Sequence, residues 1–182
     1  LRAEFGTGRN ILLLSPNNKF FLIAYFAIIK SGNVCIPLDP NIEKENLEFI
    51  SDLTKPVMIF MTREVEKKTT IGQIRSIFPD TIGNNEYNAG FTGKDEGFDG
   101  NKCAEIIFTS GSTGIPKGVM ISHRNLIANT ESIITYLKLG QNDRMLVVLP
   151  FYYCYGLSLL HTHLRVGGSI VFNNSFLFIG GV

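Results

Sequence analysis

Short apolar segments alternate with helical patterns along the first part of the chain, and this alternation constrains the fold most strongly. Residues 10–14, 34–37 and 57–61 are apolar runs with the length and composition of buried strands. The apolar run over 20–29 is shorter than the roughly twenty residues that cross a bilayer, so it predicts a buried helix. Such alternation is typical of an α/β fold, in which layers of helices cover a mainly parallel sheet.

The later patterns continue this alternation and suggest a division of the chain. Helices are predicted from about residue 43 and over 63–78, 123–139 and 152–166, and strands over 104–109, 118–122, 145–149 and 169–172. Five glycines together with Asn and Asp occur between 83 and 102, which is a long irregular segment for one compact unit. We therefore expect a first α/β lobe over 1–82, a glycine-rich linker over 83–103 and an incomplete phosphate-loop lobe over 104–182.

Composition excludes several classes of protein. The 182 residues are 45% hydrophobic and 18% charged, as in a folded chain, and the formal net charge of +1 with no basic stripe gives no reason to expect nucleic acid. Cys35, Cys103 and Cys154 have no metal-ligand spacing and favour reduced thiols in a cytoplasm. His161 and His163 are two residues apart on a predicted helix, so we expect surface or hydrogen-bonded histidines and no metal site there.

Residues 106–118, Ile-Ile-Phe-Thr-Ser-Gly-Ser-Thr-Gly-Ile-Pro-Lys-Gly, carry the strongest functional signal. Glycines let the backbone turn consecutive N–H groups toward an anion, and hydroxyl groups can donate to phosphate oxygens. Lys117 adds a mobile positive charge. The alternative is a polar glycine-rich hairpin turn, which would not need the lysine, so we favour a phosphate-binding loop.

The spacing of this loop differs from the two best-known phosphate motifs. A Walker loop counted from Gly111 would place its second glycine at 116, where the chain has Pro116, and Lys117 is followed by Gly118 in place of Ser or Thr. A strand pattern, and no helix, follows the loop, and no Gly-x-Gly-x-x-Gly occurs in it. A Walker NTPase or phosphotransferase and a Rossmann dehydrogenase are therefore disfavoured.

The segment from Phe108 to Val119 resembles the phosphate-loop signature of the AMP-forming adenylating superfamily, which includes acyl-CoA synthetases, luciferase-like enzymes and peptide-synthetase adenylation domains. Two flanking segments support the resemblance at the right spacing. Residues 29–40 are similar to the family's Leu-Lys-Ala-Gly-x-x-x-x-Pro-Leu-Asp-Pro segment, and residues 149–157 to its Leu-Pro-x-Phe-His-x-x-Gly segment. The three segments span nearly the whole chain.

The resemblance implies a reaction and a set of site residues. The family joins a carboxylic acid to AMP from ATP with Mg²⁺, then transfers the acyl group to CoA or to a phosphopantetheine carrier protein; a small carboxylic or amino acid and an acyl carrier protein are the implied partners. Lys117 is the implied catalytic residue. The implied contacts with ATP are Thr109, Ser110, Gly111, Ser112, Thr113, Gly114 and Lys117.

The downstream segment departs from the family at one position, because Tyr153 stands where histidine is common. Tyr153 and Tyr152 are candidates for a substrate pocket, with ordinary core packing of the aromatic residues at 151–155 as the alternative. His123, at a position the family shares, is expected to cap a helix, and Asp39-Pro40 to form a turn after a strand.

The chain lacks the family's adenine-binding Tyr-Gly-x-Thr-Glu segment, its ribose-binding aspartate and its C-terminal domain with a catalytic lysine. We therefore expect a fragment of the large N-terminal domain that is inactive alone. A non-catalytic nucleotide- or phosphate-binding remnant is the alternative.

Overall fold

The computed structural model describes residues 1–69, 74–81, 98–109 and 115–172. Within these ranges the helices are α1 (Arg2–Phe5), α2 (Lys19–Lys30), α3 (Lys44–Thr54), α4 (Arg63–Lys68), the 3₁₀ turn η1 (Pro79–Thr81), α5 (His123–Leu137) and α6 (Cys154–Val166). The strands are β1 (Asn10–Leu14), β2 (Val34–Leu38), β3 (Met58–Met61), β4 (Arg75–Ile77), β5 (Cys103–Thr109), β6 (Lys117–Ser122), β7 (Arg144–Val147) and β8 (Ser169–Phe172).

Six of these strands form one sheet in the order β4-β3-β1-β2-β5-β6. All neighbours pair in parallel except β5 and β6, which are antiparallel. A second sheet contains β7 and β8 in parallel. The predicted α/β class with a mainly parallel sheet is confirmed.

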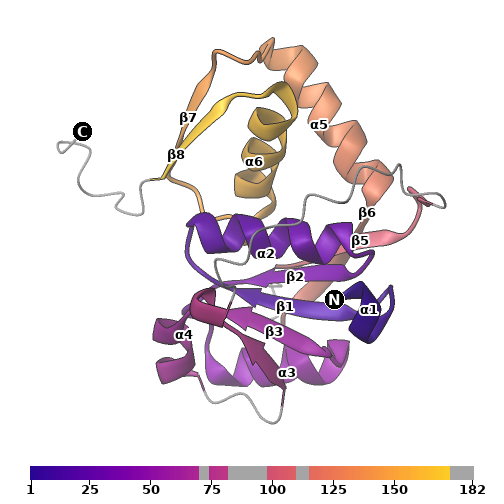
Figure 1. Cartoon of the computed structure of the whole chain (residues 1–182), viewed down its shortest axis with the longest axis vertical. Helices are drawn as coiled ribbons and strands as arrows, with labels where there is room; N and C mark the ends of the chain where they lie inside the picture. Colours follow the sequence, from indigo (N-terminus) through magenta and orange to yellow (C-terminus); the bar gives the residue numbers. More distant parts are fainter. Residues whose placement is uncertain (70–73, 82–97, 110–114, 173–182) are drawn as a thin grey trace.

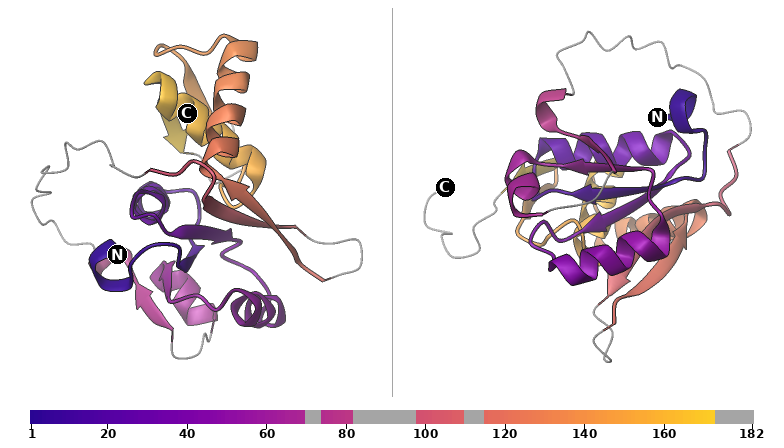
Figure 2. Two further views of the ribbon diagram at one scale, coloured as in Figure 1. Left: turned by 90° about the vertical axis from the view of Figure 1, so that its right-hand side faces the viewer. Right: turned by 90° about the horizontal axis from the view of Figure 1, so that it is seen from below.

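Each face of the large sheet has its own apolar layer, because side chains alternate along the strands. On one face Leu12 and Leu14 pack with Leu47 and Ile50 of α3 and with Val65 of α4. On the other face, Ile11 and Leu13 pack with α2, and the same cluster continues to residues of β7 and α6, namely Met145, Val147, Leu157 and Leu160. Helix α2 therefore lies between the large sheet and the unit formed by α5, α6, β7 and β8 (Figure 1, Figure 2).

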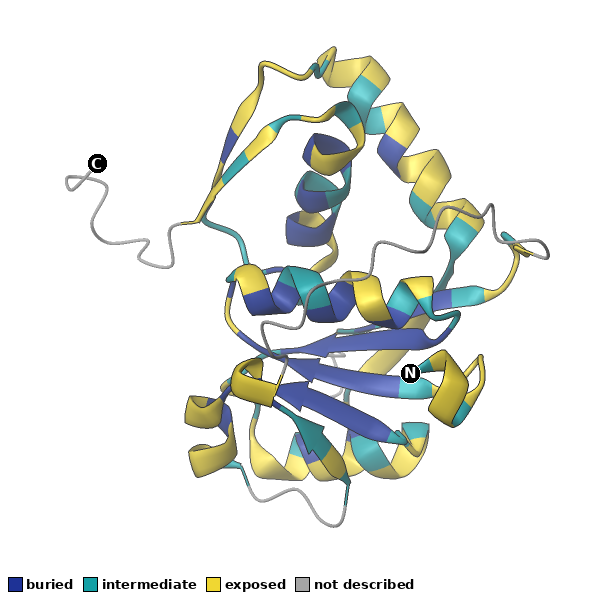
Figure 3. Ribbon diagram, in the orientation of Figure 1, coloured by how far each residue is buried: buried dark blue, intermediate teal, exposed yellow. Residues whose placement is uncertain are grey.

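The buried helix predicted over 20–29 is α2, which lies between the sheet and α6 (Figure 3), and its buried residues belong to the cluster that contains residues of both. Asn18 caps its first turn by accepting a hydrogen bond from the N–H of Phe21 at 2.9 Å. Gly32, with φ of 77°, follows the helix end and allows the reversal into β2. Within the described ranges, no helix combines the length and hydrophobicity that a membrane span requires.

The helix predicted over 63–78 was wrong beyond its first turns. Helix α4 ends at Lys68, and the residues from Arg75 to Ile77 form β4, which pairs in parallel with β3. The β-branched run Thr69-Thr70-Ile71 has low helix propensity, and pairing with β3 satisfies the backbone groups that a longer helix would have used. Sheet pairing overrode a weak helical pattern.

The large sheet continues across the predicted linker. Strand β2, before the linker, pairs in parallel with β5 after it through Cys35 and Glu105. Most of the linker, residues 83–97, lies outside the described residues. The division into two lobes remains a prediction, and one sheet unites their strands.

Candidate functional site

The base of the predicted phosphate loop is an antiparallel hairpin. The last residue pair of strands β5 and β6 before the loop is Thr109 opposite Lys117. The Thr109 hydroxyl donates to the Lys117 carbonyl at 3.4 Å. Both side chains are exposed, so they are free to contact a ligand above the hairpin. The strand predicted after the loop, in place of a helix, is confirmed as β6.

The remaining loop residues, Ser110, Gly111, Ser112, Thr113 and Gly114, lie outside the described residues. Their predicted contacts with a triphosphate stay a prediction. The hairpin fixes only where the loop begins and ends.

A cavity of about 270 Å³ lies next to the hairpin base, at the carboxyl ends of β2 and β5. Ligands of open α/β sheets commonly bind at this edge. The cavity brings together all three segments that carried the family resemblance. Its lining comprises Pro37, Leu38, Asp39, Asn41, Ile42, Glu43, Asn46, Ile50, Phe108, Thr109, Pro116, Tyr152 and Tyr153.

Tyr152 and Tyr153 both line this cavity, and their role in a substrate pocket stays a prediction. Their rings lie 4.7 Å apart between centroids, at an angle of 49°. Burial raises the pKa of Tyr152, and the charge of Asp39 and a hydrogen bond to it raise this pKa further. Tyr152 therefore stays a neutral hydrogen-bond donor at physiological pH. Asp39 also accepts from the backbone N–H of Asn41 at 2.8 Å, which confirms the predicted turn.

The other two aromatic residues of this segment do not line the cavity. Phe151 is fully buried and packs on Phe21 with ring centroids 5.3 Å apart, so it belongs to the core. Tyr155 is exposed. The alternative of ordinary core packing therefore holds for Phe151, and the role of Tyr152 and Tyr153 stays a prediction.

The turn before α6, which carries the two tyrosines, is held by hydrogen bonds and close packing. The side chain of Asn17 donates to the Leu149 carbonyl at 2.8 Å and accepts from the Phe151 N–H at 2.9 Å. A Cβ atom at Gly156 would lie 2.1 Å from the Pro150 carbonyl oxygen, which no real side chain could occupy. Glycine at this position is thus required by close backbone packing, because the turn folds directly against the first turn of α6.

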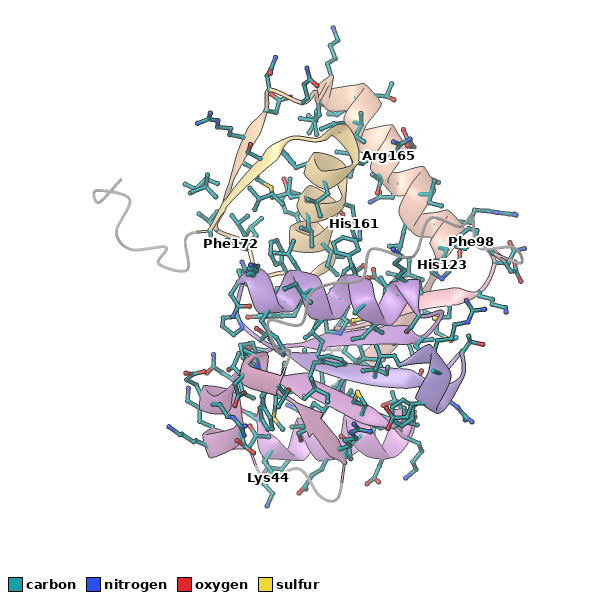
Figure 4. The ribbon with its side chains drawn as sticks, in the orientation of Figure 1. Lys44, Phe98, His123, His161, Arg165 and Phe172 are labelled. Atoms are coloured by element: carbon teal, nitrogen blue, oxygen red, sulfur yellow. The ribbon has the colours of Figure 1, made fainter. Side chains whose placement is uncertain are left out.

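The histidines differ in part from expectation. Ser122, and not His123, caps α5: its hydroxyl accepts a hydrogen bond from the Asn125 N–H at 3.2 Å. The short Ser122 hydroxyl can reach this N–H. His123 already lies in the helix and packs on Phe98 (Figure 4). His161 is hydrogen-bonded to the Tyr25 hydroxyl at 2.8 Å, as the expectation of a satisfied histidine required. Within the described part of the chain, no cluster of three or more His, Cys, Asp or Glu side chains could hold a metal ion.

Comparison with known families decides the chain's ancestry. A family model described as "AMP-binding enzyme" matches residues 1–178. The chain belongs to the AMP-binding enzyme family. The sequence resemblance drawn from the three segments is thereby confirmed.

Members of the AMP-binding enzyme family similar to this chain include ligases with different acceptors. A D-alanine--D-alanyl carrier protein ligase of Listeria welshimeri is 31% identical over 167 residues, covering 88% of this chain and 32% of that protein. The peroxisomal OPC-8:0-CoA ligase 1 of Arabidopsis thaliana is 29% identical over 182 residues, covering 90% of this chain and 33% of that protein. The chain therefore spans about a third of the length of these curated relatives.

The fold is shared with solved structures. The crystal structure of ATP-bound MatB from Rhodopseudomonas palustris superposes with a TM-score of 0.77 at 23% identity, covering 95% of this chain and 36% of that one. This similarity supports the arrangement of sheets and helices, and at this identity it supports the fold alone.

Two features of the structure escaped the sequence patterns. Asp39 was predicted only as a turn residue, yet it contacts Tyr152 in the candidate site. Glu105 is buried among Tyr25 and His161, far along the chain from both. A charged residue inside the apolar strand Ala-Glu-Ile-Ile-Phe was the available signal for Glu105.

Proposed function

We propose that this chain contributes the phosphate-loop part of an ATP-dependent ligase that converts a carboxylic acid to an acyl-adenylate. The observation that carries the proposal is the convergence of the three family segments on the cavity beside Thr109 and Tyr153. In this reaction a carboxylate oxygen attacks the α-phosphorus of ATP, a P–O bond forms, and the bond to pyrophosphate breaks. A carboxylic acid with a pKa of about 4 is already ionised at neutral pH, so the site needs no general base.

The residues of the chain would then serve mainly to align the reactants and to stabilise the departing pyrophosphate. Lys117 supplies a positive charge at the hairpin base, and Thr109 a hydroxyl. The loop between them, 110–114, adds backbone N–H groups and hydroxyls. Mg²⁺, held on the phosphate oxygens, would neutralise further charge, and we assign no residue of this chain to it.

Tyr152 and Tyr153 form the side of the cavity that would receive the acid. The names of the relatives support two classes of acid and acceptor: an amino acid passed to a carrier protein, and a carboxylic acid passed to CoA. We propose transfer of the acyl group to one of these thiols as the second step. The three free cysteines support the expected cytoplasmic location, because thiols stay reduced there.

ATP–pyrophosphate exchange with a panel of carboxylic and amino acids tests this proposal, measured on the 182-residue chain and on the full-length product of its gene. Acid-dependent exchange by the full-length product supports it. ATP binding without exchange in both forms would favour the non-catalytic nucleotide-binding alternative. Exchange by the 182-residue chain would overturn the expectation that this part is inactive alone.

Replacement of Lys117 tests the assignment of the loop. We expect Lys117→Ala in the full-length product to lose one charge-assisted contact, roughly 1.5–3 kcal/mol in ATP affinity or in the barrier to exchange. Lys102→Ala is the matched control, since Lys102 precedes β5 at the other end of the hairpin and loses the same charge. Equal exchange and ATP affinity in both variants would remove Lys117 from the site.

A further inference from the structure

A buried chain of hydrogen bonds joins β5, α2 and α6, away from the phosphate loop. The Tyr25 hydroxyl donates to Oε2 of Glu105 at 2.7 Å and lies 2.8 Å from Nε2 of His161. Tyr25 is fully buried, and Glu105 is only 1% exposed. A tyrosine has a single hydroxyl proton, so His161 must donate its Nε2–H to the tyrosine oxygen when Tyr25 donates to Glu105.

This set of hydrogen bonds uses one of the two carboxylate oxygens of Glu105. Oε2 accepts from Tyr25, while the second oxygen makes no hydrogen bond within the residues that the structure describes. The second oxygen is not fully enclosed, since Ser51 Oγ is the buried side-chain atom without a partner among the described residues. A donor that enters the cavity can therefore reach the second Glu105 oxygen. Burial raises the pKa of Glu105 to about 7, and the Tyr25 hydrogen bond opposes this shift.

The carboxyl group borders a cavity of about 510 Å³ between the β5–β6 hairpin and helices α5 and α6. Most of the cavity wall is apolar, with Val119, Met120, Leu126 and Leu157 among its residues. Among the lining residues that the structure describes, Glu105 is the only acidic one, and none is Lys or Arg. The cavity therefore places one carboxylate beside neutral polar groups and hydrocarbon side chains.

The polar groups beside Glu105 offer both acceptors and donors. The side-chain N–H₂ of Asn129 donates to the Ser158 hydroxyl at 3.2 Å, which leaves the Asn129 carbonyl oxygen as an acceptor. The Asn125 carbonyl oxygen already accepts from the N–H and hydroxyl of Ser122, so Asn125 offers its N–H₂ as a donor. The Ser158 hydroxyl in turn donates to the Cys154 carbonyl at 2.8 Å. Burial lowers the pKa of His161 to about 4, so its ring is neutral and offers an Nδ1 lone pair. The Glu105 oxygen and these acceptors favour a ligand that brings donors at that end of the cavity.

We propose that this cavity binds a small organic cation, a primary ammonium group carrying a hydrocarbon chain, with the ammonium on Glu105 and the hydrocarbon along Val119, Met120, Leu126 and Leu157. The ammonium satisfies the free carboxylate oxygen by a charge-assisted hydrogen bond in a site of low polarity. The hydrocarbon chain replaces water at the apolar wall. Neither the phosphate loop nor the cavity at Tyr152 takes part.

The charged and titratable groups around Glu105 favour a positively charged ligand. From β2 the buried thiol of Cys35 faces the carboxylate, and burial keeps the pKa of this thiol well above its usual range, so it carries no charge. The ion pair between Arg165 on α6 and Glu131 on α5, at 2.8 Å, lines a neighbouring cavity and is mutually neutralised. The groups facing Glu105 from the packed elements are Tyr25 (α2), Cys35 (β2), Cys103 (β5) and His161 (α6).

Calorimetric titration of the 182-residue chain with n-butylammonium, n-butanol and butyrate tests the proposal. At pH 8 we expect butylammonium to bind about tenfold or more tightly than butanol, a difference of about 1.4 kcal/mol, and butyrate to bind least. At pH 5.5 this preference should vanish, because Glu105 is then protonated. Butanol binding as tightly as butylammonium at pH 8 would overturn the proposal.

Glu105→Gln keeps the shape of the side chain and removes its charge, so it should abolish the preference for butylammonium. Glu131→Gln is the matched control: it removes one carboxylate of α5 that lies outside the cavity lining, and it should keep the preference. Retention of the preference in Glu105→Gln contradicts the site. If Glu105→Gln does not fold, the unmodified chain can be titrated with butylammonium near pH 6.5 in two buffers of different ionisation heat. Butylammonium binding must then release a proton from Glu105. Binding without proton release overturns the proposal.

Discussion

At the scale of single residues, Glu105 and His161 affect stability in opposite ways as pH changes. The folded-state pKa of Glu105, about 7, lies above its reference value of 4.5, so its contribution is complete below pH 4.5 and is lost as pH rises toward 7. The pKa of His161, about 4, lies below its reference value of 6.5, so its contribution is complete above pH 6.5 and is lost as pH falls toward 4. Between about pH 4.5 and 6.5 the loss of stability from Glu105 with rising pH and the gain from His161 therefore cancel.

Replacing either Glu105 or His161 should reveal how the other residue makes the free energy of unfolding depend on pH. We expect the free energy of unfolding of His161→Gln to fall by about 3 kcal/mol between pH 4.5 and 7.5, since the Glu105 term then acts alone. Glu105→Gln should show a rise between pH 4 and 6.5. Urea unfolding at a series of pH values measures both, and a flat profile in His161→Gln would show that Glu105 does not titrate in this range.

At the scale of elements, the turn that joins β7 to α6 depends on Gly156. An added methyl group would meet the backbone carbonyl of Pro150, which cannot rotate away as a side chain could. We expect Gly156→Ala to destabilise the protein by about 1–3 kcal/mol, the usual cost of overpacking, and to displace Tyr152 and Tyr153. Thermal unfolding and the near-ultraviolet circular dichroism of the tyrosines measure the two effects.

Gly140→Ala provides the comparison, because a Cβ atom at Gly140 would come no closer than 4.0 Å to a neighbouring atom, the Asp143 carboxylate. Its effect should stay within about 0.5 kcal/mol. Equal stability of the two variants would mean that the turn can relax away from α6.

The elements themselves were predictable where one signal was strong. Strands β1 and β8 have the predicted bounds, since their runs are apolar and bounded by turn residues. The region after Lys68 was not predictable from local pattern, because β4 exists through pairing with β3. The candidate site follows the same rule: the loop and the two tyrosines had sequence signals, whereas the contact of Asp39 with Tyr152 arises only when β2 and the turn before α6 meet.

At the scale of the whole molecule, one hydrophobic core contains residues from both sides of the linker that composition suggested. Helix α2 buries Phe21 and Ile28 in one cluster with Ile107, Phe151 and residues of α6, all beyond the linker. The Asn17 side chain also fixes the Phe151 turn across 134 positions of sequence. Glycine content identified an irregular segment, but it carried no information on which strands would pair across that segment.

We therefore expect residues 1–82 alone to lack cooperative folding. Removal of β5 would leave β2 paired with β1 on one side alone, as an exposed edge strand, and would expose the side of α2 that packs against α6. The prediction is a urea transition for residues 1–82 that is broad and shallow, with little amide-exchange protection in β2, while residues 1–172 unfold in one sharp step. A sharp transition and protected amides in the shorter chain would instead establish 1–82 as an independent lobe, because only a complete core of its own could make β2 stable without β5.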